Sequence, residues 1–427
     1  ISMLLGNPRP RTLIIVPKSI ISQWAQEITL FAGSHIDINV FDGPNRKLET
    51  ASVTIAPYSL LSAKGSKPDA TTPLHHVKWD RIILDEAHEI RNRKSKNFKN
   101  IHKLHSDIRW IVTGTPVYNS LDDFISLCMF LGLDQNFVQY KHTEIRDIYI
   151  LRRTKEDLAL VNSRLQLPPC KFENVELDMY EEEMALYQHV FLEAQGTIQE
   201  ACRSTSSYKN MIILECLLRA RQCMIWPQMY YDGMAFKNKI EAIKWDGRSK
   251  KMETLFRMIE EHPNEKSLIF CQFRGEMNYI QSQLDCPVFR IDGSVPKEER
   301  VRQINGFKKI ESGAVFIIQI KSGGQGLNLQ EATRVYITAP AWNPATELQA
   351  IGRSHRTGQT KSVYVKKLVY KECSRFISVE EEMMALQGHK SLVCSEVLND
   401  DRVKTQIPVN RTSAKISILD IKKIFRA

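Results

Sequence analysis

Residues 81–88 read RIILDEAH and join a short apolar run to a polar ending. The run is nearly continuous, which is typical of a strand whose two faces are both covered. Asp85 and Glu86 would then stand at the carboxyl end of a parallel strand, where open α/β sheets bind their ligands. One carboxylate there can hold Mg²⁺ and a second can polarise an attacking water. By itself an Asp-Glu pair is more often a solvated turn.

Similar apolar runs recur on both sides of this one, with helical spacing between them. The runs before and after it occupy residues 12–17, 53–55, 109–113, 267–273, 287–293, 314–320, 334–340 and 362–369. Helical spacing marks residues 19–31 and 121–132. Strands that alternate with helices indicate parallel sheets covered by helices. We therefore predict an α/β protein with two such lobes.

A different pattern separates the two groups of runs. Residues 178–226 have helical periodicity and few Gly or Pro residues, and 245–251 (WDGRSKK) resembles a linker. We predict that 170–246 is mostly helical and inserted between the lobes. The predicted domains are a first lobe at 1–170, a helical insertion and linker at 171–246, a second lobe at 247–400 and a C-terminal tail at 401–427.

Composition limits the class of protein. The chain has 427 residues, 43% hydrophobic and 25% charged, which is ordinary for a globular protein. No apolar run reaches about 18 residues, so we predict no membrane partner. The nine cysteines include no C-x-x-C pair, which disfavours a zinc module and a disulfide framework. A net charge of +10 permits nucleic acid as a partner.

Three further segments carry candidate phosphate chemistry. Thr113-Gly114-Thr115-Pro116 follows a strand, and its small hydroxyls can contact a phosphate or a carboxylate, although a plain turn explains it equally well. Ser322-Gly323-Gly324-Gln325-Gly326 also follows a strand and leaves backbone N–H groups open to phosphate, unless it is only a glycine-rich turn. Residues 349–359 read QAIGRSHRTGQ.

In that last segment Arg353 and Arg356 are spaced i, i+3, which places them on one face of a helix. Two guanidinium groups on one face can clamp the charge that develops on a transferred phosphoryl group. The alternative is a solvated basic helix face.

Taken in order, these segments closely resemble the Swi/Snf-type branch of the superfamily 2 helicase-like ATPases. The resemblance spans about residues 1–370. It rests on IVPKSIISQW (15–24), DEAH (85–88), TGTPVYNSLDDFISL (113–127), RARQCMIWP (219–227), LIFCQF (268–273), DGSVPKEER (292–300), SGGQGLNLQEA (322–332), WNP (342–344) and QAIGRSHRTGQ (349–359). It implies two RecA-like lobes with a helical insertion, and ATP and Mg²⁺ as cofactors.

The resemblance also implies roles for individual residues. Asp85 matches the Mg²⁺ ligand and Glu86 the base that orients the attacking water. His88, Thr113 and Thr115 match elements that couple nucleotide state to motion, with Gly114, Gly324 and Gly326 beside the nucleotide. Arg353 and Arg356 match the arginine fingers, with Gln349 as their partner at the γ-phosphate. The positions that match the DNA groove are Lys18, Ser19, Gln272, Ser322, Gly323 and Trp342.

The sequence departs from the family pattern in several places. The phosphate-binding loop G-x-G-K-T is absent, and the opening ISMLL resembles the tail of the helix that follows this loop. We therefore expect a truncated chain that does not hydrolyse ATP efficiently by itself. Ser322 replaces a usual Ala, Trp226 a usual His, and Leu348 a common acid. No zinc-binding RING lies between the lobes, so we expect no built-in ubiquitin ligase.

The charge distribution supports DNA binding independently of the resemblance. Residues 91–103 hold six Lys or Arg and no acid, and residues 351–375 hold seven with one acid, Glu372. Such runs are usually solvated helix faces, but both adjoin the candidate nucleotide segments. Without a helix-turn-helix or zinc module, we expect DNA binding without sequence preference, and the resemblance implies that the DNA is double-stranded.

The sequence therefore predicts an ATP-driven double-stranded DNA translocase that remodels or displaces DNA-bound proteins, with nucleosomes among its candidate partners. Two alternatives stay open. One is a non-catalytic DNA-binding scaffold that has lost the phosphate loop, and the other is a strand-separating helicase acting on RNA or DNA. We expect a nuclear protein, or one at a viral replication site.

Overall fold

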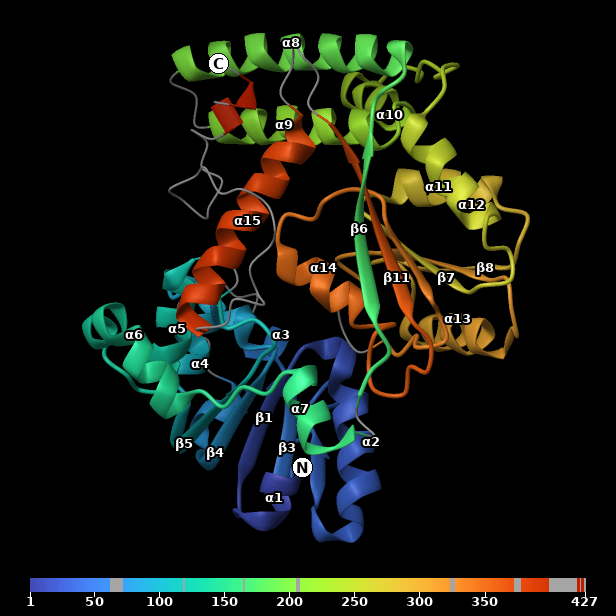
Figure 1. Cartoon of the computed structure of the whole chain (residues 1–427). Helices are drawn as coiled ribbons and strands as arrows, with labels where there is room; N and C mark the ends of the chain where they lie inside the picture. Colours follow the sequence, from blue (N-terminus) through green and yellow to red (C-terminus); the bar gives the residue numbers. More distant parts are fainter. Residues whose placement is uncertain are drawn as a thin grey trace. The chain divides into compact units, whose positions relative to one another are not determined.

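The computed structural model describes residues 1–61, 72–117, 120–163, 166–204, 208–322, 327–371, 378–398, 421–422 and 424–425 (Figure 1). They form two compact units. The first unit takes in the described residues of 1–151 and 390–404, and the second takes in those of 152–389 and 405–427. The predicted domain boundaries at 170, 246 and 400 stay predictions.

The first unit contains a five-stranded sheet in the order β2-β3-β1-β4-β5, with all neighbours parallel. Its strands are β1 (Thr12–Val16), β2 (Ile38–Val40), β3 (Val53–Pro57), β4 (Lys78–Asp85) and β5 (His105–Val112). Its helices are α1 (Ser2–Gly6), η1 (Lys18–Ile20), α2 (Ile21–Ala32), η2 (Gly33–His35), α3 (Tyr58–Leu61), η3 (Pro73–His76), η4 (Ala87–Ile90), α4 (Lys96–His102), α5 (Leu121–Phe130) and α6 (Gln135–Tyr149).

Strand β1 shows why the strands of this sheet read as apolar runs. All its positions are buried, and successive side chains enter different cores. Leu13 and Ile15 pack in one cluster with residues of α4 and α5, whereas Ile14 and Val16 pack in another with residues of α2. Because both faces are covered, apolar side chains are favoured throughout the middle of the strand.

The second unit contains a six-stranded parallel sheet in the order β6-β11-β10-β7-β9-β8. Its strands are β6 (Cys170–Leu177), β7 (Ser267–Cys271), β8 (Val288–Ile291), β9 (Val315–Gln319), β10 (Arg334–Ile337) and β11 (Val363–Tyr370). Its helices are α7 (Lys155–Val161), α8 (Glu181–Arg203), α9 (Lys209–Ile225), α10 (Gln228–Asn238), α11 (Lys250–Glu260), α12 (Arg274–Gln283), α13 (Lys297–Lys309) and α14 (Pro344–Ile351). A last helix, α15 (Val379–Leu398), begins in the second unit and ends in the first.

Two parallel sheets covered by helices confirm the predicted α/β class with two lobes. In the second unit, residues of α11 and α12 pack on one face of the sheet and residues of α13 and α14 on the other. Helices α8 and α9 lie side by side (Figure 1) and share a core with α10 and α11, which confirms the helical stretch at 178–226. Among the described residues, no helix is both long and apolar enough to span a membrane.

The prediction of helix is wrong for residues 170–177, which form strand β6. This strand pairs with β11 along its whole length, from Cys170 opposite Val363 to Leu177 opposite Tyr370. It is an edge strand, and most of its side chains are exposed. An edge strand needs no continuous apolar run, so the signal that marked the other strands was absent here.

The predicted linker at 245–251 is also partly wrong, because Lys250 and Lys251 open helix α11. The side chain of Lys251 is fully buried, and its Nζ lies 2.5 Å from Oε1 of Glu380. Tyr370 lies between these groups and a second acid, since its hydroxyl donates to Glu183 at 2.8 Å and its N–H donates to Glu380 at 2.9 Å. A buried charge of this kind depends on its partner.

We expect Lys251→Ala to lower the free energy of unfolding by about 3–5 kcal/mol, because it leaves the Glu380 carboxylate buried without its cation. Urea unfolding of the wild-type and variant chains measures the loss. Lys371→Ala is the matched control, since Lys371 and Glu176 form a pair at 3.3 Å with both side chains well exposed. An exposed pair contributes about 0–1 kcal/mol. Equal losses of unfolding free energy in the two variants would contradict the conclusion that Glu380 depends on Lys251 as its buried partner.

Candidate nucleotide and nucleic-acid site

The parallel register of the first sheet brings three predicted segments to one edge. Asp85, the last residue of β4, lies opposite Val112 of β5, so residues 113–115 follow directly beside it. On its other side Ile15 of β1 lies opposite Leu84, so Lys18 and its neighbours leave the same edge. The structure therefore places the DEAH segment, the TGTP segment and the segment after β1 next to one another.

The carboxylate of Asp85 is held by hydrogen bonds on both oxygens. The indole Nε1–H of Trp24 donates to Oδ2 at 2.7 Å, and the backbone N–H of Glu86 donates to Oδ1 at 2.9 Å. The hydroxyl of Tyr58 donates to the backbone carbonyl of Asp85 at 2.8 Å. Burial raises the pKa of Asp85, and the Trp24 hydrogen bond acts in the opposite direction.

Glu86 stands in a strained backbone conformation. Its φ is 50° and its ψ is 49°, and among the described residues the only other non-glycine with positive φ is Lys239. Residues held in this region cluster at functional sites, because the surrounding structure must compensate for the strain. The strain turns the chain sharply from β4 into η4 and marks Glu86 as a candidate reactive group.

The side chain of Glu86 is mostly buried and faces His88. Its Oε2 lies 3.3 Å from Nδ1 of His88, a contact that attracts only when the imidazole is protonated. The contact lacks hydrogen-bond geometry, so Glu86 Oε2 is a buried acceptor without a hydrogen-bond donor among the described residues. Such an atom is suited to accept a hydrogen bond from a bound water.

The TGTP segment adds a hydroxyl beside these carboxylates. The Thr115 N–H donates to Oγ1 of Thr113 at 3.1 Å, which closes a tight turn around Gly114. Oγ1 of Thr115 is buried and has no hydrogen-bond partner among the described residues. An unsatisfied hydroxyl at this edge can donate to an oxygen of a ligand.

Two carboxylates and free acceptor positions fit a magnesium site. Mg²⁺ is usually held by one or two carboxylates, with waters and substrate phosphates completing the shell. Among the described residues, no group of three or more His, Cys, Asp or Glu is arranged to hold a metal. Asp85 would therefore hold Mg²⁺ together with water and phosphate oxygens.

The second sheet gathers its predicted residues in the same way. Gln272 follows β7 and Ser322 follows β9, and these strands are neighbours with Cys271 opposite Gln319. Trp342 follows β10, which pairs with β7 on the other side. All three residues therefore leave the carboxyl edge of the sheet. Gly323, Gly324 and Gly326 lie outside the described residues.

A buried acid positions Gln272. Oε1 of Glu276 accepts the backbone N–H groups of Gln272 and Phe273, and the Thr338 hydroxyl donates to Oε2 at 2.9 Å. Burial raises the pKa of Glu276 to about 7. The side-chain amide of Gln272 donates to the Ala339 carbonyl at 3.3 Å. Ser322 is fixed by a donor bond from its hydroxyl to Oε1 of Gln319 at 3.1 Å.

The prediction that Arg353 and Arg356 share one face of a helix is wrong. Helix α14 includes Gln349 but ends at Ile351, and the chain then continues in turns. The Ser354 hydroxyl donates to the Ala332 carbonyl at 2.5 Å. This buried hydrogen bond ties the segment to a neighbouring loop and prevents the helix from continuing.

A second anchor lies further along the same turns. The Gln359 amide donates to the carbonyls of Gln330, Ala332 and Ser354. Arg356 donates to the Leu327 carbonyl at 3.5 Å, and both arginines remain partly accessible. They can still approach a ligand, but from an anchored loop and not from a helix face.

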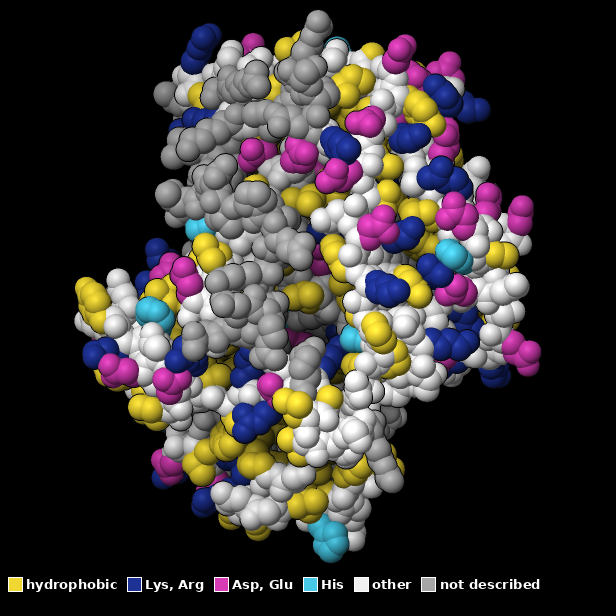
Figure 2. Space-filling view, viewed as in Figure 1, with side chains coloured by type: hydrophobic (Ala, Val, Ile, Leu, Met, Phe, Trp, Pro, Cys, Tyr) yellow, Lys and Arg dark blue, Asp and Glu magenta, His cyan; other side chains and the backbone are white. Residues whose placement is uncertain are grey.

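The two basic runs differ in the structure. In the first, Lys94, Lys96, Lys99 and Lys103 are exposed. In the second, Lys367 is buried 3.1 Å from Glu347, while Lys366 and Lys371 lie 3.7 and 3.3 Å from Glu173 and Glu176. Glu173, Glu176 and Glu347 lie outside residues 351–375, so the charge counted within that run did not include them. They neutralise part of its positive charge. On the face shown in Figure 2, basic and acidic side chains are interspersed.

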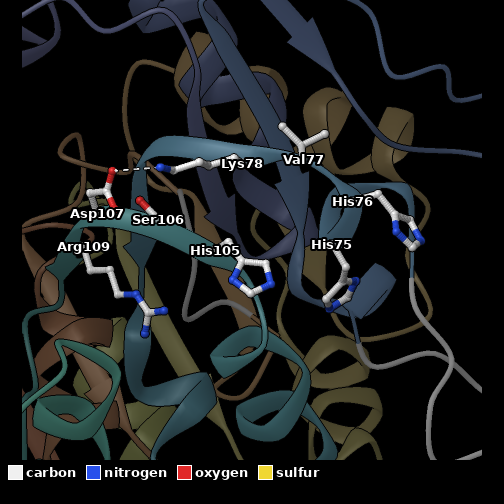
Figure 3. A pocket seen from close by; sticks show the side chains of 8 residues that line it. All are labelled: His75, His76, Val77, Lys78, His105, Ser106, Asp107 and Arg109. Atoms are coloured by element: carbon white, nitrogen blue, oxygen red, sulfur yellow. Dashed lines mark ion pairs between the residues drawn. The ribbon is translucent and has the colours of Figure 1, made fainter.

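A shallow cavity of about 410 Å³ lies at the other end of the first sheet (Figure 3). It is lined by residues at the amino ends of β4 and β5, among them His75, Lys78 and His105. Lys78 points toward Asp107, 3.6 Å away, and both ring nitrogens of His75 have partners in Thr72 and Asn100. The cavity is therefore remote from Asp85 along the strands.

Reasoning from sequence missed Trp24 and Tyr58 as site residues. Trp24 ends the quoted segment 15–24, and Tyr58 directly follows β3. Both belong to segments that leave the same sheet edge as Asp85, which is the one signal that could have found them. Their contacts with Asp85 need the tertiary structure.

Two family models match the chain. The SNF2-related domain matches residues 6–142 and 134–229, and the helicase conserved C-terminal domain matches residues 250–358. The helicase-like transcription factors of Mus musculus and Homo sapiens are 27% and 28% identical to this chain. Each alignment covers 90% of this chain and 50% of the relative. DNA repair protein RAD5B of Arabidopsis thaliana is 25% identical, covering 92% of this chain and 41% of its own length.

Among solved structures, the Sulfolobus solfataricus SWI2/SNF2 ATPase core in complex with dsDNA is 27% identical, with a TM-score of 0.43. The match covers 99% of this chain and 88% of that one. The chain spans about half the length of the curated relatives it matches. With the SNF2-related model matching over half of the residues and the helicase C-terminal model following it, the chain belongs to the SNF2-related family.

Proposed function

We propose that the protein is an ATP-dependent translocase on double-stranded DNA, which remodels or displaces DNA-bound proteins. The observation that carries this proposal is the edge of the first sheet, where the strained Glu86 stands beside the fixed carboxylate of Asp85. Family membership supports a helicase-like ATPase, and the exposed lysines that follow η4 in the chain support a polyanionic partner.

Each part of the site has a task in ATP hydrolysis. Asp85 would hold Mg²⁺, which neutralises charge on the phosphate oxygens when it is bound. Glu86 would accept a hydrogen bond from the attacking water and take its proton, for which its unsatisfied Oε2 is placed. His88, Thr113 and Thr115 border these groups and would respond to the nucleotide.

The second unit would supply positive charge and part of the DNA grip. Arg353 and Arg356 would stabilise the charge on the transferred phosphoryl group, with Gln349 beside them. Gln272, Ser322 and Trp342 would contact DNA, as would Lys18 and Ser19 of the first unit. These contacts come mostly from polar groups at the end of strands and suit a sugar-phosphate backbone better than base edges. We propose a place of action in the nucleus or at a viral replication site.

We expect Glu86→Gln to lower DNA-stimulated ATP hydrolysis by about 10²- to 10⁴-fold, because the amide cannot take the proton of the attacking water. Hydrolysis is measured on the protein translated from the complete gene, since the 427 residues contain no G-x-G-K-T. Glu89→Gln is the matched control, because it makes the same change in the same turn. An unchanged rate in Glu86→Gln would remove Glu86 from the proposed role.

The same assay separates the alternatives. Duplex DNA, single-stranded DNA and RNA are compared as activators. Stimulation by RNA alone would favour a strand-separating helicase acting on RNA. Duplex binding without any hydrolysis would favour a scaffold.

We expect the 427-residue chain to bind duplex DNA with log K falling against log salt at a slope of about −5, since contact with about six phosphates releases that many counterions. Fluorescence anisotropy at several salt concentrations gives the slope, and two unrelated duplexes should bind equally. The triple variant Lys94→Ala, Lys96→Ala and Lys99→Ala should flatten the slope. Lys366→Ala with Lys371→Ala should not, because these lysines are ion-paired. A slope near zero would contradict a phosphate-based contact.

A further inference from the structure

Trp24 contacts the site from the segment that follows β1. It lies on helix α2, directly after η1, and its Nε1–H donates to Oδ2 of Asp85 at 2.7 Å. The distance is short for an N–H···O bond, as expected when the acceptor is a carboxylate. Together with the Glu86 N–H on Oδ1, this contact fixes the plane of the carboxylate.

The chemistry of an indole restricts what Trp24 can do. The ring offers one N–H donor and no acceptor, so it can neither bind a metal nor exchange a proton at this site. Its aromatic body packs against the apolar cluster of α2 and β1, which holds the donor in place. A rigid donor of this kind can orient the carboxylate.

A second tryptophan in the same unit provides a natural comparison. Trp79 of β4 is buried, and its Nε1–H donates to the Leu74 carbonyl at 2.9 Å. That hydrogen bond ties η3 to the sheet and lies near the amino end of β4, away from Asp85. The two indoles thus make similar hydrogen bonds, of which only one reaches the candidate site.

We propose that Trp24 is a positioning residue for the metal-binding carboxylate of Asp85. The indole holds one oxygen so that the remaining lone pairs of the carboxylate face the edge of the sheet, where Mg²⁺ and phosphate would bind. Partners of this type orient metal ligands, and their loss usually weakens metal binding without changing the ligand itself. The proposal rests on the proposed function for one point, which is that Asp85 binds Mg²⁺.

The hydrogen bond itself is tested without any nucleotide. In a ¹H–¹⁵N spectrum of the 427-residue chain, each of the six tryptophans gives one indole signal, and Trp24→Phe identifies that of Trp24. Asp85→Asn replaces a charged acceptor with a neutral one and should move the Trp24 indole proton upfield, leaving that of Trp79 in place. An unmoved Trp24 signal would overturn the proposal.

The consequence for the metal is tested on the protein from the complete gene. Trp24→Phe should raise the Mg²⁺ concentration for half-maximal DNA-stimulated hydrolysis about tenfold, the lower end of typical effects of outer-shell partners. Its affinity for duplex DNA should stay unchanged. Trp79→Phe is the matched control and should leave both quantities unchanged, with circular dichroism confirming that both variants fold.

The experiments distinguish a failure of the role of Trp24 from a failure of the proposed function. If the wild-type protein hydrolyses ATP and Trp24→Phe needs no more Mg²⁺ than the wild type, the role of Trp24 is overturned and the proposed function stands. A wild-type protein that hydrolyses no ATP would overturn the proposed function, and the role of Trp24 with it. If Trp24→Phe does not fold, the Asp85→Asn spectrum decides, with the Trp24 signal assigned by sequential resonance assignment of the wild-type chain.

Discussion

The parallel pairing of the strands is the constraint on which both candidate sites depend. Parallel strands end at the same edge of a sheet, so any segment that follows a strand meets its neighbours there. In the first unit this brings residues 113–115 beside Asp85, and in the second it brings Ser322 beside Gln272. Residues far apart in the chain therefore meet without any dedicated contact between them.

The edge of the first sheet combines rigidity with strain. Glu86 adopts a left-handed backbone conformation that residues with a Cβ atom rarely adopt, and the buried strand before it holds it there. Asp85 has the opposite character, because three donors from Trp24, Glu86 and Tyr58 remove its freedom. A fixed carboxylate next to a strained one with an open acceptor suits the proposed hydrolysis of the phosphoanhydride of ATP.

The folded chain exposes less of its positive charge than the sequence alone indicates. Along the sequence, the net charge of +10 is concentrated in two basic runs, with six and seven Lys or Arg residues. The lysines of the first run stay exposed in and around α4, but three lysines of the second are paired with acids from β6 and α14. DNA binding is therefore expected to depend more on the first run, together with the polar groups at the strand ends.

The sequence by itself determined the α/β class, most of the buried strands and the family, because double burial leaves continuous apolar runs and phosphate chemistry needs fixed residue types. It did not determine β6, whose edge position requires no such run, or the end of α14 before Arg353, which long-range hydrogen bonds of Ser354 and Gln359 impose. The contact between Trp24 and Asp85 was likewise decided by tertiary structure, since a hydrogen bond between segments depends on how the strands are ordered in the sheet.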